Sequence, residues 1–366
     1  MDSTNKNKII FIHFNNNYSG SPKVLKSVID AISDENDILI TNNTEGFLSN
    51  IKNIKYKYFK FELRDNKIIT FFTYFLAQMN IFIKVFVCCE KDDLLYINTV
   101  VPIFAAISGK LKGAKILFHL HEDTSCLNIV HRNLSKLRPM FCDTEIFVSK
   151  YLYEKEHVLG IKSYILPNTL SVSFLNEGQS YDKRDIESDF NLIMICSLKK
   201  YKGVYEFLKV ANKLIAYNSI KFILLLSDDE ERIKNYFTNI IIPKNVLIYS
   251  KVIDTINFYK NASVLLSLSR PDEWIETFGL TILEAMAFGL PCIVPKIGGP
   301  IELIEDGING FRVSAYDIDE VVEKILLLYN DKKLYKYISN NNKLKSKEFS
   351  YDSFSLTINK IIQAII

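Results

Sequence analysis

Short apolar segments that read as strands alternate along this chain with stretches that read as helices, and this alternation limits the fold more than any other feature. Parallel strands joined by helices are buried on both faces, so they appear as continuous apolar runs. In the first half we expect strands at residues 8–14, 37–41, 94–98, 115–120 and 145–149. A second series follows the polar stretch 171–189, with strands at residues 191–196, 221–226, 246–249, 264–268 and 292–295. The sequence therefore predicts two parallel α/β sheets in tandem.

The length of 366 residues also fits two α/β domains better than one. We place the N-terminal domain at residues 1–167 and the C-terminal domain at residues 168–350. Residues 351–366 read as a final apolar helix. In such tandem sheets, ligands bind beyond the carboxyl ends of the strands, so the loops that follow the strands are the place to look for chemistry.

The charge balance argues against a nucleic-acid-binding protein. The formal net charge is only +3, and nucleic acid usually needs a concentrated basic face. Residues 1–165 contain 21 Lys and Arg against 17 Asp and Glu, and the remainder contains 24 against 25. A mildly basic first half would help the protein to approach an anionic membrane surface.

The cysteines and the first residues indicate a cytoplasmic protein. No two cysteines form a CxxC pair or have metal-ligand spacing, and most lie in or beside apolar runs, as buried free thiols do. The first ten residues lack the basic region and apolar stretch of a secretory signal. We therefore expect a reducing compartment and no disulfide framework.

One apolar segment, residues 68–89, is long enough to resemble a membrane span. Gln78, Asn80 and Lys84 interrupt it, and the flanking topology signals of a span are missing. We interpret it as a long buried helix of the N-terminal domain.

Residues 276–291 are the most informative for chemistry. Gly289 and the proline two residues later predict the end of a helix that begins near Phe278. Glu276 then lies in the loop before this helix, and Glu284 lies in its first turns. Free N–H groups at a helix N-terminus can receive a phosphate, and carboxylates beside them can accept hydrogen bonds from sugar hydroxyls. The arrangement fits a bound sugar diphosphate.

Two further loops favour the same interpretation. Residues 197–203 join the first strand of the second half to its helix, and their lysines could neutralise a diphosphate. Residues 296–302 place two glycines at another strand-to-helix junction. Each feature alone has a simpler explanation: a solvated basic turn, ordinary turn chemistry, or a capping box of Thr281 and Glu284. Because all three loops follow strands of one sheet, we expect them at the same edge, which favours an anion site.

In the first half, Gly20 lies in the loop after the first strand, and His119 and His121 close the strand that begins at residue 115. The two histidines share a face, but the sequence offers no third metal ligand beside them. For His121 we favour a polar or catalytic role at the strand end. A structural, hydrogen-bonded role is the alternative for His119, and we assign no role to His13, His131 or His157.

Together these motifs resemble retaining glycosyltransferases of the family 4 type, the glycosyl transferases group 1, which have the GT-B fold. The resemblance is most specific in EtfGltiLEAMAfGlP at 276–291, GGPiE at 298–302 and DGiNGF at 306–311. Weaker matches are the Gly20 loop, HLHE at 119–122, FVSKYL at 147–152, LPN at 166–168 and KG at 202–203. The resemblance implies two Rossmann-like domains whose parallel sheets face each other across a cleft, and a last helix, 351–366, that packs back on the first domain.

The resemblance also implies roles for individual residues. Glu284 matches the glutamate that binds the nucleotide ribose, and Glu276 matches the glutamate near the donor-sugar hydroxyls. Lys202 matches the lysine that stabilises the diphosphate leaving group. His121 matches a histidine close to the reacting sugar, and Gly20 matches a glycine loop that faces the donor. The backbone that approaches the donor sugar and phosphate is matched by Phe278, Gly279 and Leu280.

The chain departs from the family pattern at one position. Many members carry an arginine shortly after the first strand of the C-terminal domain, paired with the lysine on the diphosphate, and here that position is Ser197. Lys199 or Lys200 would then compensate, or Lys202 would act with helix dipoles alone. We include Ser197, Lys199 and Gly203 in the predicted donor site.

The implied reaction transfers a hexosyl group from a UDP- or GDP-sugar to a saccharide or lipid-linked saccharide, with retention of the anomeric configuration. We find no DxD motif suited to a donor-bound metal and expect neither a metal nor another cofactor. By analogy, the pathway is bacterial surface polysaccharide synthesis, with a peripheral contact at the inner face of the cytoplasmic membrane. Two alternatives stay open: a sugar-nucleotide epimerase of the same architecture, and a non-catalytic partner subunit that binds a nucleotide sugar.

Overall fold

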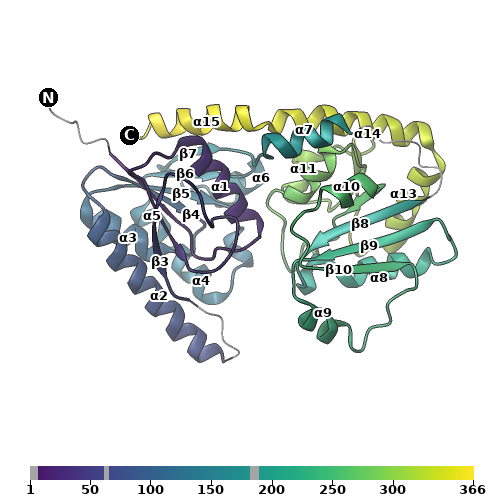
Figure 1. Ribbon diagram of the computed structural model, residues 1–366, viewed down its shortest axis with the longest axis horizontal. Coiled ribbons are helices and arrows are strands. Elements are labelled where there is room, and N and C mark those ends of the chain that lie inside the picture. Colours follow the sequence, from purple (N-terminus) through teal and green to yellow (C-terminus); the bar gives the residue numbers. More distant parts are fainter. Residues whose placement is uncertain (1–6, 62–65, 182–188) are drawn as a thin grey trace. The chain divides into compact units, whose positions relative to one another are not determined.

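The computed structural model describes residues 7–61, 66–181 and 189–366 of the chain. Two compact units divide them (Figure 1): one takes in the chain up to Thr169 together with Asp352–Ile366, and the other takes in Leu170–Tyr351. Each unit contains one parallel sheet with helices between its strands. The expectation of two Rossmann-like α/β domains is therefore confirmed.

The sheet of the first unit has seven strands in the order β3-β2-β1-β4-β5-β6-β7, and all neighbours are parallel. The strands are β1 (Ile9–Ile12), β2 (Ile38–Asn42), β3 (Lys55–Phe59), β4 (Leu94–Asn98), β5 (Lys115–Leu120), β6 (Thr144–Phe147) and β7 (Lys162–Ile165). The central strands β1, β2 and β4 are buried along their whole length, as the continuous apolar runs predict.

The helices of the first unit come from both ends of the chain. They are α1 (Gly20–Ile32), α2 (Lys67–Cys88), α3 (Ile103–Lys112), η1 (Thr124–Cys126), α4 (Ile129–Ser135), α5 (Arg138–Phe141), α6 (Lys150–Glu156) and α15 (Tyr351–Gln363). Phe354 and Ile358 of α15 are buried in one core with Phe11 of β1 and Leu25 of α1. The Asn359 side chain also donates a hydrogen bond to the carbonyl of Ala31 (3.2 Å). The last helix therefore packs on the first unit.

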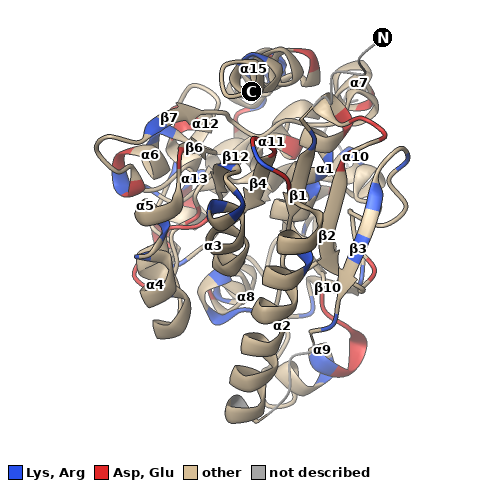
Figure 2. Cartoon of the chain, turned by 90° about the vertical axis from the view of Figure 1, so that its left-hand side faces the viewer, with Lys and Arg blue, Asp and Glu red and all other residues tan. Residues whose placement is uncertain are grey.

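The interpretation of residues 68–89 as a long buried helix is only partly correct. The helix is present, but only the face with Tyr74, Ala77, Ile81 and Val85 is buried. The opposite face is exposed, and Figure 2 shows no acidic residue along it. By length and composition this helix could cross a membrane. Sequence hydropathy failed here because it does not distinguish an apolar face that packs on the domain from one that faces outward.

The sheet of the second unit has six parallel strands in the order β10-β9-β8-β11-β12-β13. The strands are β8 (Phe190–Cys196), β9 (Ile220–Leu226), β10 (Val246–Ser250), β11 (Val264–Leu266), β12 (Cys292–Val294) and β13 (Gly310–Arg312). The helices are α7 (Val172–Ser180), η2 (Lys200–Lys202), α8 (Val204–Lys213), α9 (Glu230–Phe237), α10 (Ile256–Asn261), α11 (Leu280–Ala287), α12 (Pro300–Leu303), α13 (Ile318–Asn330), α14 (Lys332–Ser346) and η3 (Lys347–Phe349).

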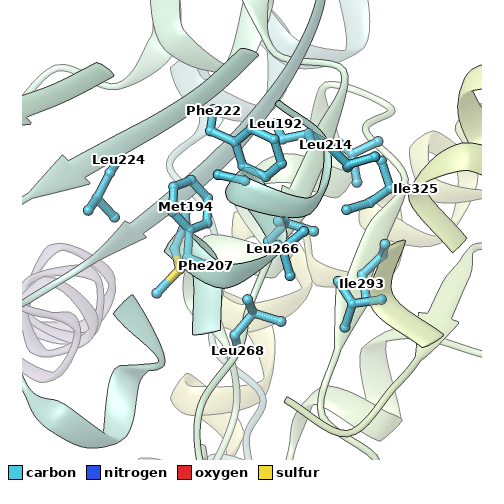
Figure 3. Packing of buried hydrophobic residues seen from close by; sticks show 14 of the residues in the cluster. Leu192, Met194, Phe207, Leu214, Phe222, Leu224, Leu266, Leu268, Ile293 and Ile325 are labelled. Carbon is cyan, nitrogen blue, oxygen red and sulfur yellow. The ribbon is translucent and has the colours of Figure 1, made fainter. Parts of the chain in front are cut away.

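The core of the second unit fixes the position of α8 against the sheet (Figure 3). Phe207 of α8 is fully buried and meets Phe222 of β9 edge-on, with 5.3 Å between the ring centroids. Met194 of β8 belongs to the same cluster. Removing such a buried ring typically costs about 3–5 kcal/mol of stability. This packing holds the first turn of α8, and the loop before it, at the carboxyl edge of the sheet.

Candidate active site

Three loops of the second unit meet at the carboxyl edge of its sheet. They follow β8, β11 and β12, which are adjacent in the sheet and parallel. The expectation that the three loops share one edge is therefore confirmed. The loops cover residues 197–203, 267–279 and 295–299.

An ion pair joins the first two loops. The Lys202 ammonium donates a hydrogen bond to Oε2 of Glu276 at 2.7 Å, and about a quarter of each side chain is exposed (23% and 24%). Burial alone would lower the pKa of Lys202, but the charge and hydrogen bond of Glu276 outweigh it and raise this pKa above its ordinary value. Lys202 therefore stays protonated. The structure brings together these two predicted residues, which lie 74 positions apart in the chain.

Glycines allow the three loops to approach each other this closely. Gly203 has φ +81°, and a Cβ there would overlap the carbonyl oxygen of Leu268. Gly298 has φ +91°, and a Cβ there would overlap the carbonyl oxygen of Glu276. A left-handed backbone at both positions also disfavours any residue with a side chain. Gly203 and Gly298 therefore hold the loops on each side of the ion pair.

Helix α11 begins at Leu280, with Gly279 (φ +98°) as its cap residue and no side-chain hydrogen bond to the cap. Thr281 lies inside the helix, so the capping box considered for Thr281 and Glu284 is not formed. Two residues past the end of α11, Gly289 has φ +68°, as predicted for the end of this helix. Gly279 therefore supplies no side-chain cap to the first turn of α11, whose N–H groups have no partner within the helix.

Glu284 lies on α11 and is largely buried (5% exposed). Its Oε2 accepts a hydrogen bond from the Tyr259 hydroxyl at 2.7 Å. Burial, then the neighbouring Glu284 charge, raises the pKa of Tyr259 well above its ordinary value, so this hydroxyl stays a donor. Phe278, just before α11, is also buried and meets Phe349 edge-on at 6.0 Å. The carboxylate of Glu284 is therefore held in a fixed position.

The sequence analysis missed Arg270, which connects the first two loops. Its guanidinium donates to Glu206 (2.7 and 3.2 Å) and to Glu273 (2.9 Å), and its backbone N–H donates to the carbonyl of Tyr201 (2.8 Å). The hydrogen bond to Glu206 is the main reason that the pKa of Arg270 is raised. Trp274 stacks on Tyr201, with ring centroids 5.1 Å apart. These contacts hold the loop that carries Lys202 against the loop 267–279, which also carries Glu276. An arginine shortly after β11 was visible in the sequence, but its partner Glu206 lies 64 residues away.

The other predicted residues of the first loop have different environments. Ser197 is half-buried at the end of β8, and its carbonyl accepts the N–H of Lys199 at 2.7 Å. Lys200 forms an ion pair with Glu273 at 3.3 Å. The Lys199 side chain is exposed and has no ion pair among the residues that the structure describes.

In the first unit, His121 belongs to a buried polar cluster at the ends of β1, β4 and β5. Its Nε2 lies 2.9 Å from Oδ1 of Asn98, whose Nδ2 lies 3.0 Å from Nδ1 of His13. The His119 Nδ1 contacts the Tyr96 hydroxyl at 2.8 Å, which fits the structural role left open for it. Sequence reasoning assigned nothing to His13, although its place directly after β1, beside the end of β4, could have indicated it.

Burial keeps these histidines neutral. It lowers the pKa of His13 to about 4 and that of His119 to about 3. The pKa of His121 lies well below its ordinary value, first because of burial and then because of the other two histidines. Each imidazole therefore offers one donor and one acceptor near neutral pH.

Gly20 is the first residue of α1. A Cβ at this position would meet nothing within 4 Å, so the protein itself does not require a glycine here. In the described part of the chain, no group of three His, Cys, Asp or Glu side chains could hold a metal ion.

Comparisons with known proteins show which family this chain is similar to. Residues 179–345 match the family of glycosyl transferases group 1. The chain is 27% identical over 292 residues to the N-acetyl-alpha-D-glucosaminyl L-malate synthase of Bacillus anthracis, which covers 72% of this chain and 71% of that protein. It is also 27% identical over 287 residues to an uncharacterised glycosyltransferase of Methanocaldococcus jannaschii, with coverage of 75% and 76%.

Solved structures share the fold over nearly the full length. The structure of Anabaena HepE in complex with UDP-glucose superposes with a TM-score of 0.80 at 18% identity, covering 98% of this chain and 99% of that one. The apo form of the lipopolysaccharide outer core galactosyltransferase WaaB gives a TM-score of 0.69 at 19% identity, covering 98% and 100%. Residues 179–345 thus match the group 1 glycosyl transferases, and the solved structures show that the whole chain has the GT-B fold.

Proposed function

We propose that this protein is a retaining, metal-independent hexosyltransferase that takes a sugar from a UDP- or GDP-sugar and transfers it to a saccharide or lipid-linked saccharide. The observation that carries the proposal is the Lys202–Glu276 ion pair (2.7 Å), which lies between two strand-end loops. The loop that carries Glu276 leads into the N-terminus of α11, where Gly279 has no side chain that could act as a cap. A protonated lysine beside backbone N–H donors is suited to a diphosphate, since both stabilise negative charge.

The ion pair gives the proposed donor site a way to respond to its ligand. When a diphosphate arrives, the Lys202 ammonium exchanges its carboxylate partner for a phosphate oxygen. Glu276 is then available to accept hydrogen bonds from hydroxyls of the donor sugar. Stabilising the departing diphosphate is the main electrostatic task of the reaction, so Lys202 contributes most in the transition state.

Glu284 suits the ribose of the nucleotide. Tyr259 holds its carboxylate from one side (2.7 Å), and a carboxylate accepts several hydrogen bonds at once. Vicinal ribose hydroxyls are donors of matching spacing.

In the proposed retaining reaction, the acceptor hydroxyl attacks the anomeric carbon from the face that the phosphate leaves. The bond from that carbon to the phosphate oxygen breaks, and the hydroxyl proton passes to the departing phosphate. His121 is neutral, so we assign it a hydrogen-bonding role toward the sugar rather than the role of a cationic acid. Gly20, whose surroundings leave room for a ligand, would face the donor.

For the acceptor we propose a saccharide or lipid-linked saccharide of bacterial surface polysaccharide synthesis. Support comes from the basic first half of the chain and from a fold shared with a lipopolysaccharide galactosyltransferase. A lipid-linked acceptor would place the protein in the cytoplasm, peripheral to the inner face of the cytoplasmic membrane.

The test is donor binding and slow donor hydrolysis with a panel of UDP-, GDP- and ADP-sugars in the presence of a chelator. We expect selective binding of one donor by the wild type and at least about tenfold weaker binding by Glu284→Ala. Glu323→Ala, which removes an exposed acid of the same unit, is the matched control and should bind normally. A well-folded wild type that binds no donor contradicts the proposal.

The same assay separates the alternatives. A non-catalytic binding subunit would bind a donor without hydrolysing or transferring it, and Glu276→Gln would then have no turnover to lose. A sugar-nucleotide epimerase would convert the donor to its epimer without an acceptor. Neither result is expected.

A further inference from the structure

Helix α2 of the first unit exposes more large apolar side chains than its place on a sheet requires. Ten of them are exposed: Ile68, Ile69, Phe71, Phe72, Phe75, Leu76, Met79, Ile83, Phe86 and Val87. At 100° per residue they occupy a continuous arc of about 160° of the helix, and they extend over about 29 Å of its length. Soluble monomers rarely leave a contiguous apolar surface of this size without a partner.

The rest of the helix is already engaged with the first unit. The Gln78 side chain donates to the carbonyl of Val101 (2.8 Å) and accepts from the N–H of Phe104 (3.3 Å). The Tyr74 hydroxyl donates to the same carbonyl of Val101 (3.1 Å). On α3, the Ser108 hydroxyl donates to the carbonyl of Phe82 (2.8 Å). These polar contacts hold α2 along the first unit. The helix therefore exposes one apolar face to its surroundings, and it is not free to insert lengthwise into a bilayer.

Charge around this arc favours an anionic partner. The three neighbouring elements α2, α3 and β3 contain six lysines and no Asp or Glu. Figure 2 shows these elements without red segments and with blue ones along β3. The Lys112 ammonium lies 5.0 Å from the ring centroid of Phe86, near the C-terminal end of the arc. One of the six, Lys110, is partly neutralised by Asp143 (2.7 Å).

We infer that the exposed arc of α2 is a membrane-docking surface that lies in the interface of an anionic bilayer. An amphipathic helix with aromatic and aliphatic residues on one face and lysines beside it binds bilayers by burying that face among the headgroups. Lysines can extend along the apolar surface and keep their ammonium groups at the phosphates. A second copy of this chain is a poorer partner, because pairing two identical lysine-rich surfaces would bring like charges together.

Membrane docking is separate from the transfer reaction and can be tested without turnover. The experiment measures flotation of the full-length protein with phosphatidylcholine vesicles, with and without phosphatidylglycerol. The wild type should float with the anionic vesicles. The triple variant Phe72→Gln, Leu76→Gln, Ile83→Gln should lower the partition coefficient at least about 30-fold, because three large side chains no longer enter the interface.

Two further variants make the result specific. The control Leu159→Gln, Ile241→Gln, Leu344→Gln removes three apolar residues outside α2 that are about as exposed or more exposed, and it should float like the wild type. In the variant Lys57→Gln, Lys84→Gln, Lys112→Gln, the preference for anionic over neutral vesicles should fall about fivefold for each lysine removed.

Three outcomes would overturn the inference. In the first, the wild type remains unbound to both kinds of vesicle. In the second, the α2 triple variant and the control float equally well. In the third, sedimentation velocity without lipid shows a dimer that only the α2 variant disrupts, which identifies a second copy as the occupant. Donor binding by the same samples shows that the variants are folded, and it separates failure of this inference from failure of the proposed transferase function.

Discussion

The strand ends of the two units have opposite chemistry on the same kind of sheet. In the first unit, the ends of β1, β4 and β5 carry buried, neutral groups: His13, Asn98 and His121, joined at 2.9 and 3.0 Å. In the second unit, the corresponding edge carries a partly exposed ion pair of Lys202 and Glu276, with glycines packed on each side. Both edges are formed by loops after parallel strands, so the difference lies in the side chains and not in the fold.

This comparison indicates a division of roles. A charged, protonated lysine near the N-terminus of a helix is suited to stabilise a developing diphosphate, which is the role that we propose for this edge. Neutral imidazoles held by burial cannot compensate such charge, but they can orient hydroxyl groups by hydrogen bonds.

Removing the ammonium group of Lys202 should have the largest effect on transfer activity. We expect Lys202→Met to lower kcat/KM for transfer by about 10²–10³-fold, because the leaving diphosphate loses its main positive partner. Steady-state kinetics with the donor found in the panel measure this. Lys209→Met removes an exposed lysine of α8 that lies over Tyr205 (4.5 Å) and serves as the control. Equal activity of both variants would contradict the assignment of Lys202.

Closing the space between the loops should destabilise the second unit. Gly203→Ala adds a Cβ that overlaps the carbonyl of Leu268 at φ +81°, so we expect a loss of about 2–4 kcal/mol in the free energy of unfolding. Gly307→Ala has a similar φ of +73° but open space, and it should cost only about 1 kcal/mol. Gly20→Ala should leave stability unchanged and weaken donor binding. Urea unfolding of the three variants checks this order, and a similar loss for Gly203→Ala and Gly307→Ala would show that the loop contact is unimportant.

The histidines of the first unit should make its stability depend on pH. Their folded pKa values (about 4 for His13 and about 3 for His119) lie below the unfolded value, so the unfolded chain binds more protons as pH falls below about 6.5. Stability should therefore decrease on acidification, by about 1.4 kcal/mol per pH unit for each histidine. Urea unfolding from pH 7 to about pH 4.5 measures how steeply the free energy of unfolding changes with pH. His13→Asn should lower this slope by the contribution of one histidine, about 1.4 kcal/mol per pH unit. A slope that is the same in His13→Asn and wild type would contradict the buried neutral state.

The smallest expected effect comes from restoring the cation that the family pattern places at position 197. Ser197 is half-buried at the end of β8, beside the loop of Lys202. Ser197→Arg should tighten UDP binding by about three- to tenfold, because a second cation can share the diphosphate. If Lys199 already compensates, Lys199→Gln should weaken binding by a similar factor in the wild type and less in Ser197→Arg. Titration calorimetry with UDP distinguishes these cases, and no change in any variant would exclude both cations from the site.

The sequence predicted the interior of both sheets better than their edges. All ten expected strands are present, whereas β3, β7 and β13 were missed. Each of the three is the last strand at an edge of its sheet. An edge strand is covered on fewer sides, so β3 (KYKYF) and β7 (KSYI) can carry lysines and lack the continuous apolar run that marks a central strand.

Packing between elements far apart in the chain limits what could be predicted of the candidate site. Glycines, a lysine and glutamates at strand-to-helix junctions are local patterns, and the meeting of their loops follows from parallel topology. Arg270 with Glu206, and His13 with Asn98, are pairs that depend on packing between elements 64 and 85 residues apart. Local spacing contains no signal for such pairs. The exposed arc of α2 was also beyond prediction, because hydropathy cannot tell which face of a helix meets the domain.

Calorimetric titration of UDP into three variants tests whether Lys202 exchanges Glu276 for a diphosphate. The variants are Lys202→Met, Glu276→Gln and the double variant, each compared with wild type. We expect Lys202→Met to weaken UDP binding at least about tenfold, since a charge-assisted bond is lost. Glu276→Gln should bind UDP as tightly as wild type or more tightly, because Lys202 no longer has to leave a carboxylate, while its transfer activity falls. Unchanged affinity in Lys202→Met, or equal weakening in Glu276→Gln and Lys202→Met, would contradict the exchange.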